Sequence, residues 1–588
     1  MTRYARYLPI LQWSRGYGRA TLGRDLVAGL IVTIMLVPQG LAYALLAGLP
    51  PEVGLYASIL PLLAYAVFGT SRTLAVGPVA VVSLMTATAL SGVAAPGSTE
   101  YVAAALVLAV LSGLLLVVMG LLRLGLLANL LSHPVVSGFI TAAGVLIALG
   151  QLKHILGIRA PGETLPEMLH ALALNIGAVH LPTLAIGVSA TLILLWFRTR
   201  FRPLLSRAGM GRAASDMLTK TAPVLVIVVS TAIVALFALT ERGVAVVGEV
   251  PTGLPALSVP QLDLELWSTL FIPALLISVI GFVESVSVAQ TLAARRRQRI
   301  DPDQELIGLG TANIASAFSS GFPVTGGFAR SVVNFDAGAE TPAAGAFAAI
   351  GISLALVFLT PLIYFLPVAV LAATIIVAVV GLIDFHAPRE VWRYSKSDFA
   401  AMAGTIAVTL MAGVEPGVIT GVGVSVALLL WRAAHPHAAI VGLVPGSEHF
   451  RNVQRHEVLT SPNVLTLRID ESLGFVNARW LEEKVLELVA ERPDVRHLVL
   501  MCSAVNDVDA SALESLKMIN QRLNDAGVRL HLSEVKGPVL DRLARSQLLR
   551  ELTGQVFLSQ YDAYTALAAP GDTGQSVRLD ADQRLPAA

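Results

Sequence analysis

Cysteine and charge are scarce in this chain, and each scarcity excludes classes of protein. Cys502 is the single cysteine among 588 residues, so no internal disulfide can form. Charged residues make up 14% of the chain, against about 25% in an average soluble protein, while hydrophobic residues make up 55%. The 41 Lys and Arg nearly balance the 40 Asp and Glu, so the net charge of +1 creates no field that would attract DNA or RNA. A soluble enzyme, a disordered chain and a nucleic-acid binder are therefore excluded.

Catalytic and nucleotide-binding motifs are absent as well. The sequence contains no H-E-x-x-H or C-x-x-C pattern, no P-loop and no nucleophile-base constellation. We therefore predict no enzyme activity, no metal site and no cofactor. Uphill transport by such a chain would have to be coupled to an ion gradient or to a separate ATPase.

Apolar segments dominate residues 24–434. A bilayer core about 30 Å thick takes about 20 helical residues, and on this basis the sequence predicts a polytopic α-helical membrane protein with 14 spans. The spans form two sets of seven, one within 24–240 and one within 267–434. They lie near 24–48, 54–69, 74–90, 101–121, 126–150, 181–197, 221–240, 267–293, 305–320, 326–336, 342–360, 361–382, 398–413 and 417–432.

Lys and Arg gather in alternate loops. They cluster at 198–220, 295–299 and 389–396, whereas the loop at 91–100 has none. The positive-inside rule then places both termini, including the segment 1–23, in the cytoplasm. No cleavable signal is expected ahead of the first span. We expect a multi-pass protein of a bacterial inner membrane.

Two spans are short and interrupted by Gly and Pro. They are LAVGPVAVV (Leu74–Val82) and FPVTGGFARSVVN (Phe322–Asn334), each third in its set of seven. Such segments are typical of broken helices beside the midplane site of an inverted-repeat transporter. Two half-helices that begin at the bilayer centre would aim free N–H groups at one spot, which favours an anion.

Glu284 and Arg330 are ionisable residues inside predicted spans. Glu284 lies on a face of small residues, Ser278, Gly281 and Ser285, that suits close packing. It is a candidate proton carrier, and the alternative is a structural role as an ion-pair or capping partner. Arg330 falls in the first turn of the second half-helix, where the macrodipole is unfavourable for a cation. It would add positive potential to an anion site or neutralise Glu284, unless it snorkels to the interface.

Gln39 and Tyr43 share one face of the first span, four residues apart. An amide donor beside a phenol suits an oxyanion. An interhelical hydrogen bond explains Gln39 equally well, so both interpretations stay open.

The C-terminal 148 residues have a different composition. Residues 441–588 hold 36 of the 81 charged residues, and strands alternate there with helices. We expect a small cytoplasmic α/β domain over 441–568 and a disordered tail over 569–588. Ser511 and Glu514 form an S-x-x-E pattern that predicts a capping box, and Ser511 is also a candidate phosphorylation site.

These motifs, in this order, resemble the SulP sulfate permease family, whose animal members include prestin and pendrin. The matching stretches are Pro38–Arg72, Ala75–Ser83, Phe282–Ala293 and Phe322–Asn334. Residues 507–516 resemble a STAS domain. The resemblance implies 7+7 inverted repeats, an elevator-like movement of a core domain against a gate domain, and a homodimer in membrane lipid.

The resemblance also implies site residues. The anion would meet Gln39 and Tyr43, then Val79 and Ala80 at the start of the first half-helix, and Phe328, Ala329 and Arg330 on the second. Many relatives carry Ser at the position of Ala329, so one hydroxyl donor is missing here. Glu284 matches the position of a Glu in proton-coupled relatives and of an Asp in a sodium-coupled bicarbonate branch, so proton symport is favoured. Ser511 matches the residue phosphorylated in bacterial anti-sigma-factor antagonists.

We therefore expect a secondary transporter that takes up an inorganic anion, preferably sulfate, with protons. Alternatives within transport are a sodium- or proton-coupled carrier of bicarbonate or a dicarboxylate, an exchanger and a channel. A regulatory membrane scaffold that recruits a cytoplasmic partner through the STAS domain is the alternative from another class.

Overall fold

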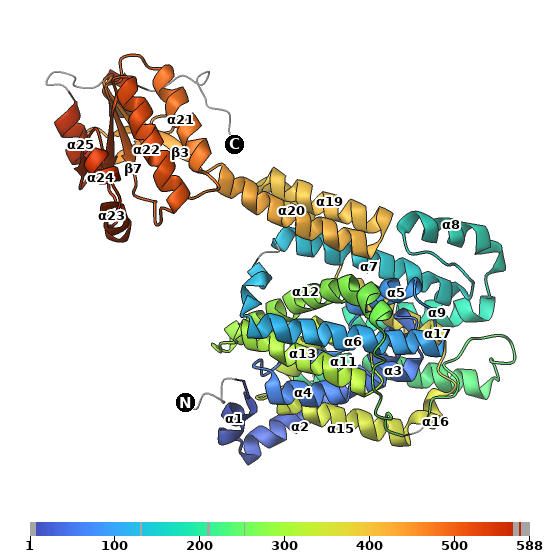
Figure 1. The fold of residues 1–588 in the computed structure, drawn as a ribbon. Coiled ribbons are helices and arrows are strands. Elements are labelled where there is room, and N and C mark those ends of the chain that lie inside the picture. The colour runs from blue at the N-terminus through green and yellow to red at the C-terminus, as the bar shows by residue number, and fades with distance from the viewer. Residues whose placement is uncertain (1–6, 130–131, 208–211, 252, 569–574, 578–588) are drawn as a thin grey trace. The chain divides into compact units, whose positions relative to one another are not determined.

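The chain divides into two compact units, Met1–Ser425 and Val426–Ala588 (Figure 1). The computed structural model describes residues 7–129, 132–207, 212–251, 253–568 and 575–577. The first unit is a bundle of helices with one short two-stranded sheet, and the second is an α/β domain.

The first unit follows the predicted spans closely. Its elements are α1 (Ile10–Trp13), η2 (Ser14–Gly16), α2 (Arg19–Leu46), α3 (Pro51–Tyr56), α4 (Leu60–Phe68), β1 (Val76–Gly77), α5 (Ala80–Ser91), α6 (Thr99–Leu121), η3 (Leu124–Asn129), α7 (His133–Leu156), α8 (Leu165–Asn175), η4 (Ile176–Ala178), α9 (Leu181–Trp196), η5 (Phe197–Phe201), α10 (Arg202–Arg207), α11 (Arg212–Leu236), α12 (Leu264–Arg295), α13 (Pro302–Phe318), β2 (Thr325–Gly326), α14 (Phe328–Asp336), α15 (Ala343–Phe358), α16 (Thr360–Ile363), α17 (Val368–Val379), α18 (Ala387–Tyr394), α19 (Lys396–Ala412) and α20 (Val414–Ala434), the last of which runs into the second unit.

Every predicted span overlaps a helix, and the predicted polytopic helical fold with two broken half-helices is confirmed. Among the described residues, 7 helical segments are long and apolar enough to cross a membrane by themselves. Shorter apolar helices, among them α5, α15 and α17, account for predicted spans that are too short to cross alone.

Glycines allow helices of the two repeats to pack in backbone contact. Gly113 of α6 faces Gly310 of α13, and a Cβ on either residue would lie 2.7 Å from the carbonyl oxygen of the other. Small residues permit such close approach in a membrane, where packing rather than hydrophobic burial holds helices together. This crossing fixes α13, which in turn positions the second broken segment.

The second unit contains a mixed sheet flanked by helices. The strand order is β10-β5-β3-β6-β7-β8-β9, with β4 beside β3, and β6 to β9 run parallel. The elements are β3 (Ala438–Leu443), β4 (Phe450–Asn452), β5 (Val458–Thr460), β6 (Val464–Ile469), α21 (Ala478–Ala490), β7 (His497–Met501), α22 (Ala510–Asp525), β8 (Arg529–Ser533), α23 (Gly537–Ala544), α24 (Leu548–Glu551), β9 (Val556–Phe557), α25 (Gln560–Leu567) and β10 (Gln575–Val577).

Two details of this unit differ from the sequence predictions. The predicted capping box at Ser511 is wrong, because Asp509 is the N-cap of α22 and accepts from the backbone N–H of Ala512 at 2.8 Å. The carboxylate of Asp509, two residues before Ser511, provides the N-cap that the S-x-x-E pattern predicted for the serine. In the tail expected to lack structure, residues 575–577 form β10 against β5, while 569–574 and 578–588 lie outside the described residues.

A histidine pair, of which His531 is buried and His497 partly buried, makes the second unit sensitive to acid. Nδ1 of His531 accepts from the backbone N–H of Gln555 at 3.0 Å, so Nε2 carries the hydrogen and donates to Nδ1 of His497 at 3.1 Å. Burial lowers the pKa of His531 to about 4, and the charges of His497 and Arg529 act in the same direction. The folded state therefore holds His531 neutral.

We expect this unit to lose stability as the pH falls from about 6.5 towards 4, because the unfolded histidine binds a proton that the folded one excludes. The loss should be about 3 kcal/mol of unfolding free energy, since the two pKa values lie about 2.5 pH units apart and each pH unit is worth about 1.4 kcal/mol. Urea unfolding of the second unit, expressed alone, at stepped pH measures it. In His531→Asn the unfolding free energy should depend less steeply on pH. Replacing the exposed His449 by Asn should leave this dependence unchanged. An unaltered slope in His531→Asn would refute the assignment.

Candidate functional site

The two broken segments meet and pair with each other. β1 and β2 run antiparallel, with Val76 opposite Gly326 and Gly77 opposite Thr325. The pairing continues past the strands, where Gly327 N donates to Ala75 O at 3.1 Å. α5 begins three residues after β1, and α14 begins two residues after β2. Two helix N-termini therefore approach one place from opposite directions, as the inverted repeats require.

Polar side chains of neighbouring helices satisfy the irregular backbone of the second segment. Asn313 of α13 brackets Val324: its Oδ1 accepts from Val324 N at 2.9 Å, and its Nδ2 donates to Val324 O at 2.8 Å. Ser285 of α12 accepts from Gly326 N at 2.9 Å. Because unsatisfied backbone groups are costly inside a membrane, these side chains allow a non-helical stretch to persist there.

Two further bonds tie the first segment to α14. Ser331 Oγ accepts from Ala75 N at 3.0 Å, and Asn334 Nδ2 donates to Thr73 O at 3.0 Å. The first broken segment is therefore held by the second half-helix. A displacement of either segment would therefore displace the other, because these hydrogen bonds connect them.

The small-residue face of α12 packs closely against a neighbour, as the sequence predicted, and the structure identifies that neighbour as β2. A Cβ on Gly281 would stand 3.2 Å from Thr325 Oγ1, which donates to Gly281 O at 2.7 Å. Ser278 and Ser285 on the same face are fully buried. This contact brings α12, and with it Glu284, beside the broken segments.

Arg330 lies where the two segments meet. It is the third residue of α14 and only 2% exposed, and its Nη1 donates to Pro78 O in the first segment. Its Nη2 would stand 2.9 Å from a Cβ on Gly327 and 3.4 Å from one on Gly77, so glycine in both segments leaves room for the guanidinium. Nε and Nη2 are buried and have no hydrogen-bond partner among the described residues.

Glu284 and Tyr43 belong to the same electrostatic cluster. The charge of Arg330 acts on both of them, and the two also interact with each other. Oε2 of Glu284 is shielded from solvent, and no described residue donates to it. A closed ion pair between Glu284 and Arg330 would have used these atoms. The predicted structural ion pair is therefore not formed in this conformation.

The remaining predicted site residues differ in how exposed they are. Val79 is the N-cap of α5, and Val79 and Ala80 are 7% and 4% exposed. Phe328 and Ala329 are exposed at the start of α14, and Gln39 is partly exposed on α2. Helix α2 packs against both α5 and α14. Backbone N–H groups, one guanidinium and one phenol thus converge here, which is a donor-rich setting for an anion, and one open carboxylate oxygen lies in the same cluster.

Sequence reasoning missed a second group of buried polar residues. Ser83 in the first turn of α5 and Thr86 one turn later carry buried hydroxyls without a described partner. They lie three residues apart on one face of α5, and this spacing is the signal that the sequence offers. They are additional candidate contacts for an anion at α5.

Glu305 is also buried but has a structural role. Its Oε2 accepts from Tyr65 Oη at 2.7 Å, and its Oε1 accepts from Thr70 N at 2.8 Å, from Ser71 N at 2.9 Å and from the Thr70 hydroxyl. Both oxygens are engaged, in contrast to Oε2 of Glu284. Glu305 therefore fastens the loop before β1 rather than offering a site.

Two further observations concern the other predictions. Ser511 is exposed in the first turn of α22, which is compatible with access by a modifying enzyme but does not test it. No group of three or more His, Cys, Asp or Glu that would hold a metal occurs in the described part of the chain.

Residues 22–405 match the family model described as the Sulfate permease family, and residues 455–563 match that of the STAS domain. Sulfate transporter 4.1, chloroplastic, of Arabidopsis thaliana is 36% identical over 570 residues, which cover 94% of this chain and 82% of that protein. A probable sulfate transporter of Mycobacterium tuberculosis (strain CDC 1551 / Oshkosh) is 34% identical over 550 residues, 93% of this chain and 95% of that one.

A solved structure shares the fold across both units. The murine Solute Carrier 26 family member A9 anion transporter in the inward-facing state aligns with a TM-score of 0.85 at 23% identity. The alignment covers 95% of this chain and 94% of that chain. Helical membrane region and C-terminal α/β domain thus occur together in both molecules.

Proposed function

Because the chain belongs to the sulfate permease family and is a membrane transporter rather than an enzyme, we propose that it takes up sulfate together with protons. The observation that carries the proposal is the buried guanidinium of Arg330, whose Nε and Nη2 lack described partners at the meeting point of two half-helix N-termini. Charge-assisted hydrogen bonds from a guanidinium match the oxygens of an oxyanion. The names of the sulfate-transporting relatives support sulfate as that anion.

Glu284 would carry the coupled proton. Its open Oε2 can accept a proton, and its charge acts on Arg330. When Glu284 is ionised, its negative charge opposes an anion beside Arg330. Protonation removes this charge, so proton binding and anion binding favour each other. A sodium ion in place of the proton is the less favoured alternative.

Movement of the site across the membrane would be elevator-like. β1 pairs with β2, the residue before β1 is bonded to α14, and the second segment is bonded to α12 and α13. These elements, together with α5, which follows β1, would therefore move as one body that carries the anion. We further propose a homodimer in the bacterial inner membrane with both termini in the cytoplasm.

A competition assay on purified protein in proteoliposomes tests the substrate. Uptake of radiolabelled sulfate is measured against unlabelled sulfate, bicarbonate, chloride and succinate. We expect unlabelled sulfate to compete at the lowest concentration. Stronger competition by bicarbonate or succinate would replace sulfate with that anion, and absence of any uptake would favour the regulatory scaffold.

A further inference from the structure

A second basic site lies at the end of the first unit where α2 begins. It is a cavity of about 910 Å³, within the range of small-molecule sites, and none of its lining residues belongs to the cluster around Arg330. Its wall comes from α1 and η2, the start of α2, the loop before β1, the turn after α12 and the loop after α14. The charged and amide side chains that line it are Gln12, Arg24, Arg72, Arg296, Gln298 and Glu340.

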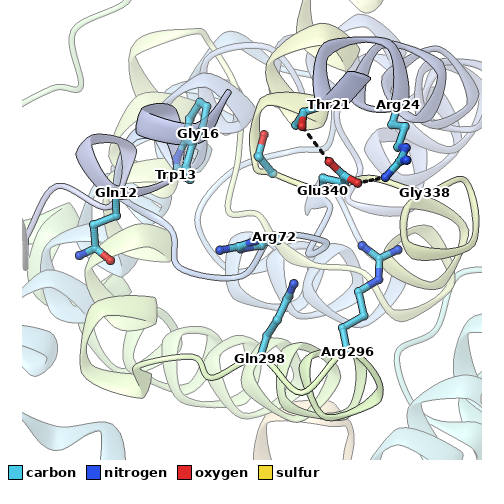
Figure 2. A pocket seen from close by; sticks show the side chains of 11 residues that line it. Gln12, Trp13, Gly16, Thr21, Arg24, Arg72, Arg296, Gln298, Gly338 and Glu340 are labelled. Carbon is cyan, nitrogen blue, oxygen red and sulfur yellow. Dashed lines mark hydrogen bonds and ion pairs between the residues drawn. The ribbon is translucent and has the colours of Figure 1, made fainter. Parts of the chain in front are cut away.

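Glu340 leaves the positive charge of this cavity largely uncompensated. Its Oε2 accepts from Thr21 Oγ1 at 2.8 Å, and its Oε1 pairs with Arg24. The hydrogen bond from Thr21 and, to a smaller extent, the hydrogen bond and charge of Arg24 hold the pKa of Glu340 below its usual value. The carboxylate therefore stays charged, and its charge is neutralised by Arg24. Figure 2 shows Arg72, Gln298 and Arg296 across the cavity from this trio.

Arg72 and Arg296 offer hydrogen-bond donors that nothing in the cavity uses. Arg72 makes no hydrogen bond to any described residue. Arg296 donates through Nη1 to Ala339 O and through Nη2 to Phe335 O at 2.7 Å, and it stacks 4.2 Å from the centroid of the Phe335 ring. A guanidinium has five N–H donors, so Arg296 retains three.

The two guanidinium groups also repel each other. Arg72 acts on Arg296 as a like charge, while Glu340, Asp25 and Asp336 attract Arg296. Asp25 does not line the cavity, and it accepts from the backbone N–H groups of Glu340 and Thr341 and from the Thr341 hydroxyl. An anion between Arg72 and Arg296 would relieve their repulsion and receive bidentate bonds.

We propose that this cavity binds the phosphate group of a phosphorylated molecule, at the face that the basic loops predict to be cytoplasmic. The donors and the charge fit a phosphate, and the volume accommodates more of a molecule than its phosphate alone. The same chemistry is offered by the headgroup of a membrane lipid and by a soluble phosphorylated metabolite.

Binding of a phosphate in this cavity would affect the two broken segments. Arg72 stands four residues before Val76 of β1, and Arg296 is bonded to the carbonyl of Phe335 near the end of α14. A phosphate that bridges the two arginines therefore joins the approach to the first segment with the end of the second half-helix. Ligand binding should raise the thermal stability of this unit.

Binding is tested on the full chain in nanodiscs of phosphatidylcholine. Inorganic pyrophosphate is titrated as the soluble probe, and phosphatidic acid is added to the bilayer as the lipid probe, with thermal unfolding and calorimetry as readouts. Arg72→Gln should weaken binding at least about tenfold, because it removes a charged donor without removing a described hydrogen bond. The double variant Arg295→Gln/Arg299→Gln is the control, since it removes two exposed charges from the same turn outside the cavity.

The outcomes separate the cavity from the transport site. Binding that survives in Arg330→Gln and is lost in Arg72→Gln supports the proposal, and the probe that binds identifies a soluble or a lipid source. Equal binding by Arg72→Gln and the wild type overturns it, as does an equal loss in the control. Failure of both probes to bind also overturns it, whatever anion the protein transports.

Discussion

Replacing Arg330 by glutamine should lower the efficiency of sulfate uptake by about 30-fold or more. Removing one partner of a buried charged pair costs about 2–5 kcal/mol, and each 1.4 kcal/mol is a factor of ten. Arg330 is 2% exposed and has unpartnered N–H groups at the meeting point of β1 and β2, so the anion would lose its charged donor. Initial rates across a range of sulfate concentrations measure the loss.

Two variants on the same turn separate charge from folding. Arg330→Lys retains the charge but not the fork of donors, so its uptake should fall between those of Arg330→Gln and the wild type. Ala329→Ser adds a hydroxyl at an exposed position of α14 and should retain or improve uptake. Wild-type uptake by a correctly folded Arg330→Gln would show that the anion does not bind at this arginine.

Replacing Glu284 by glutamine should abolish the response of uptake to a proton gradient. The ratio of uptake with and without the gradient should fall to about one, because an amide has no carboxyl proton to exchange. Binding should survive, since the substitution also removes a negative charge near the anion. Uptake with an imposed gradient and equilibrium sulfate binding measure the two effects.

Glu305 provides the comparison for Glu284. It is fully buried, whereas Glu284 is partly buried, and both oxygens of Glu305 are occupied by Tyr65, Thr70 and Ser71. Glu305→Gln should lower thermal stability and leave the gradient dependence of the folded protein intact. If Glu305→Gln instead removes the gradient dependence and Glu284→Gln keeps it, the proton pathway is assigned to the wrong carboxylate.

The sequence predicted the spans and the broken segments because composition encodes them directly. Gly and Pro interrupt Leu74–Val82 and Phe322–Asn334, and the structure has β1 and β2 there. The position of Arg330 in the first turn of α14 also followed from the motif. Local patterns of this kind need no knowledge of distant contacts.

Contacts between distant segments were not predictable in the same way. Asp25 and Glu305 are buried because loops more than 200 residues away supply their donors, and nothing local to either residue signals this. The sequence predicts only a marker of topology in the cluster Arg295–Arg299. The structure adds that Arg296 turns to Phe335 and Ala339, while Arg295, Arg297 and Arg299 remain exposed.

At Ser511 the local pattern was itself ambiguous. Both Asp509 and Ser511 are good N-cap residues, and the S-x-x-E spacing favoured the serine. The helix starts earlier, at Ala510, so Asp509 is the cap and Ser511 lies inside the first turn. A shift of two residues was enough to change the role of the serine.

The most direct test of the central claim is uptake of radiolabelled sulfate into proteoliposomes under an imposed inward proton gradient. We predict that sulfate accumulates above its external concentration and that a protonophore, which collapses the gradient, removes this accumulation. Uptake that is unchanged when the gradient is collapsed would contradict proton-coupled sulfate transport.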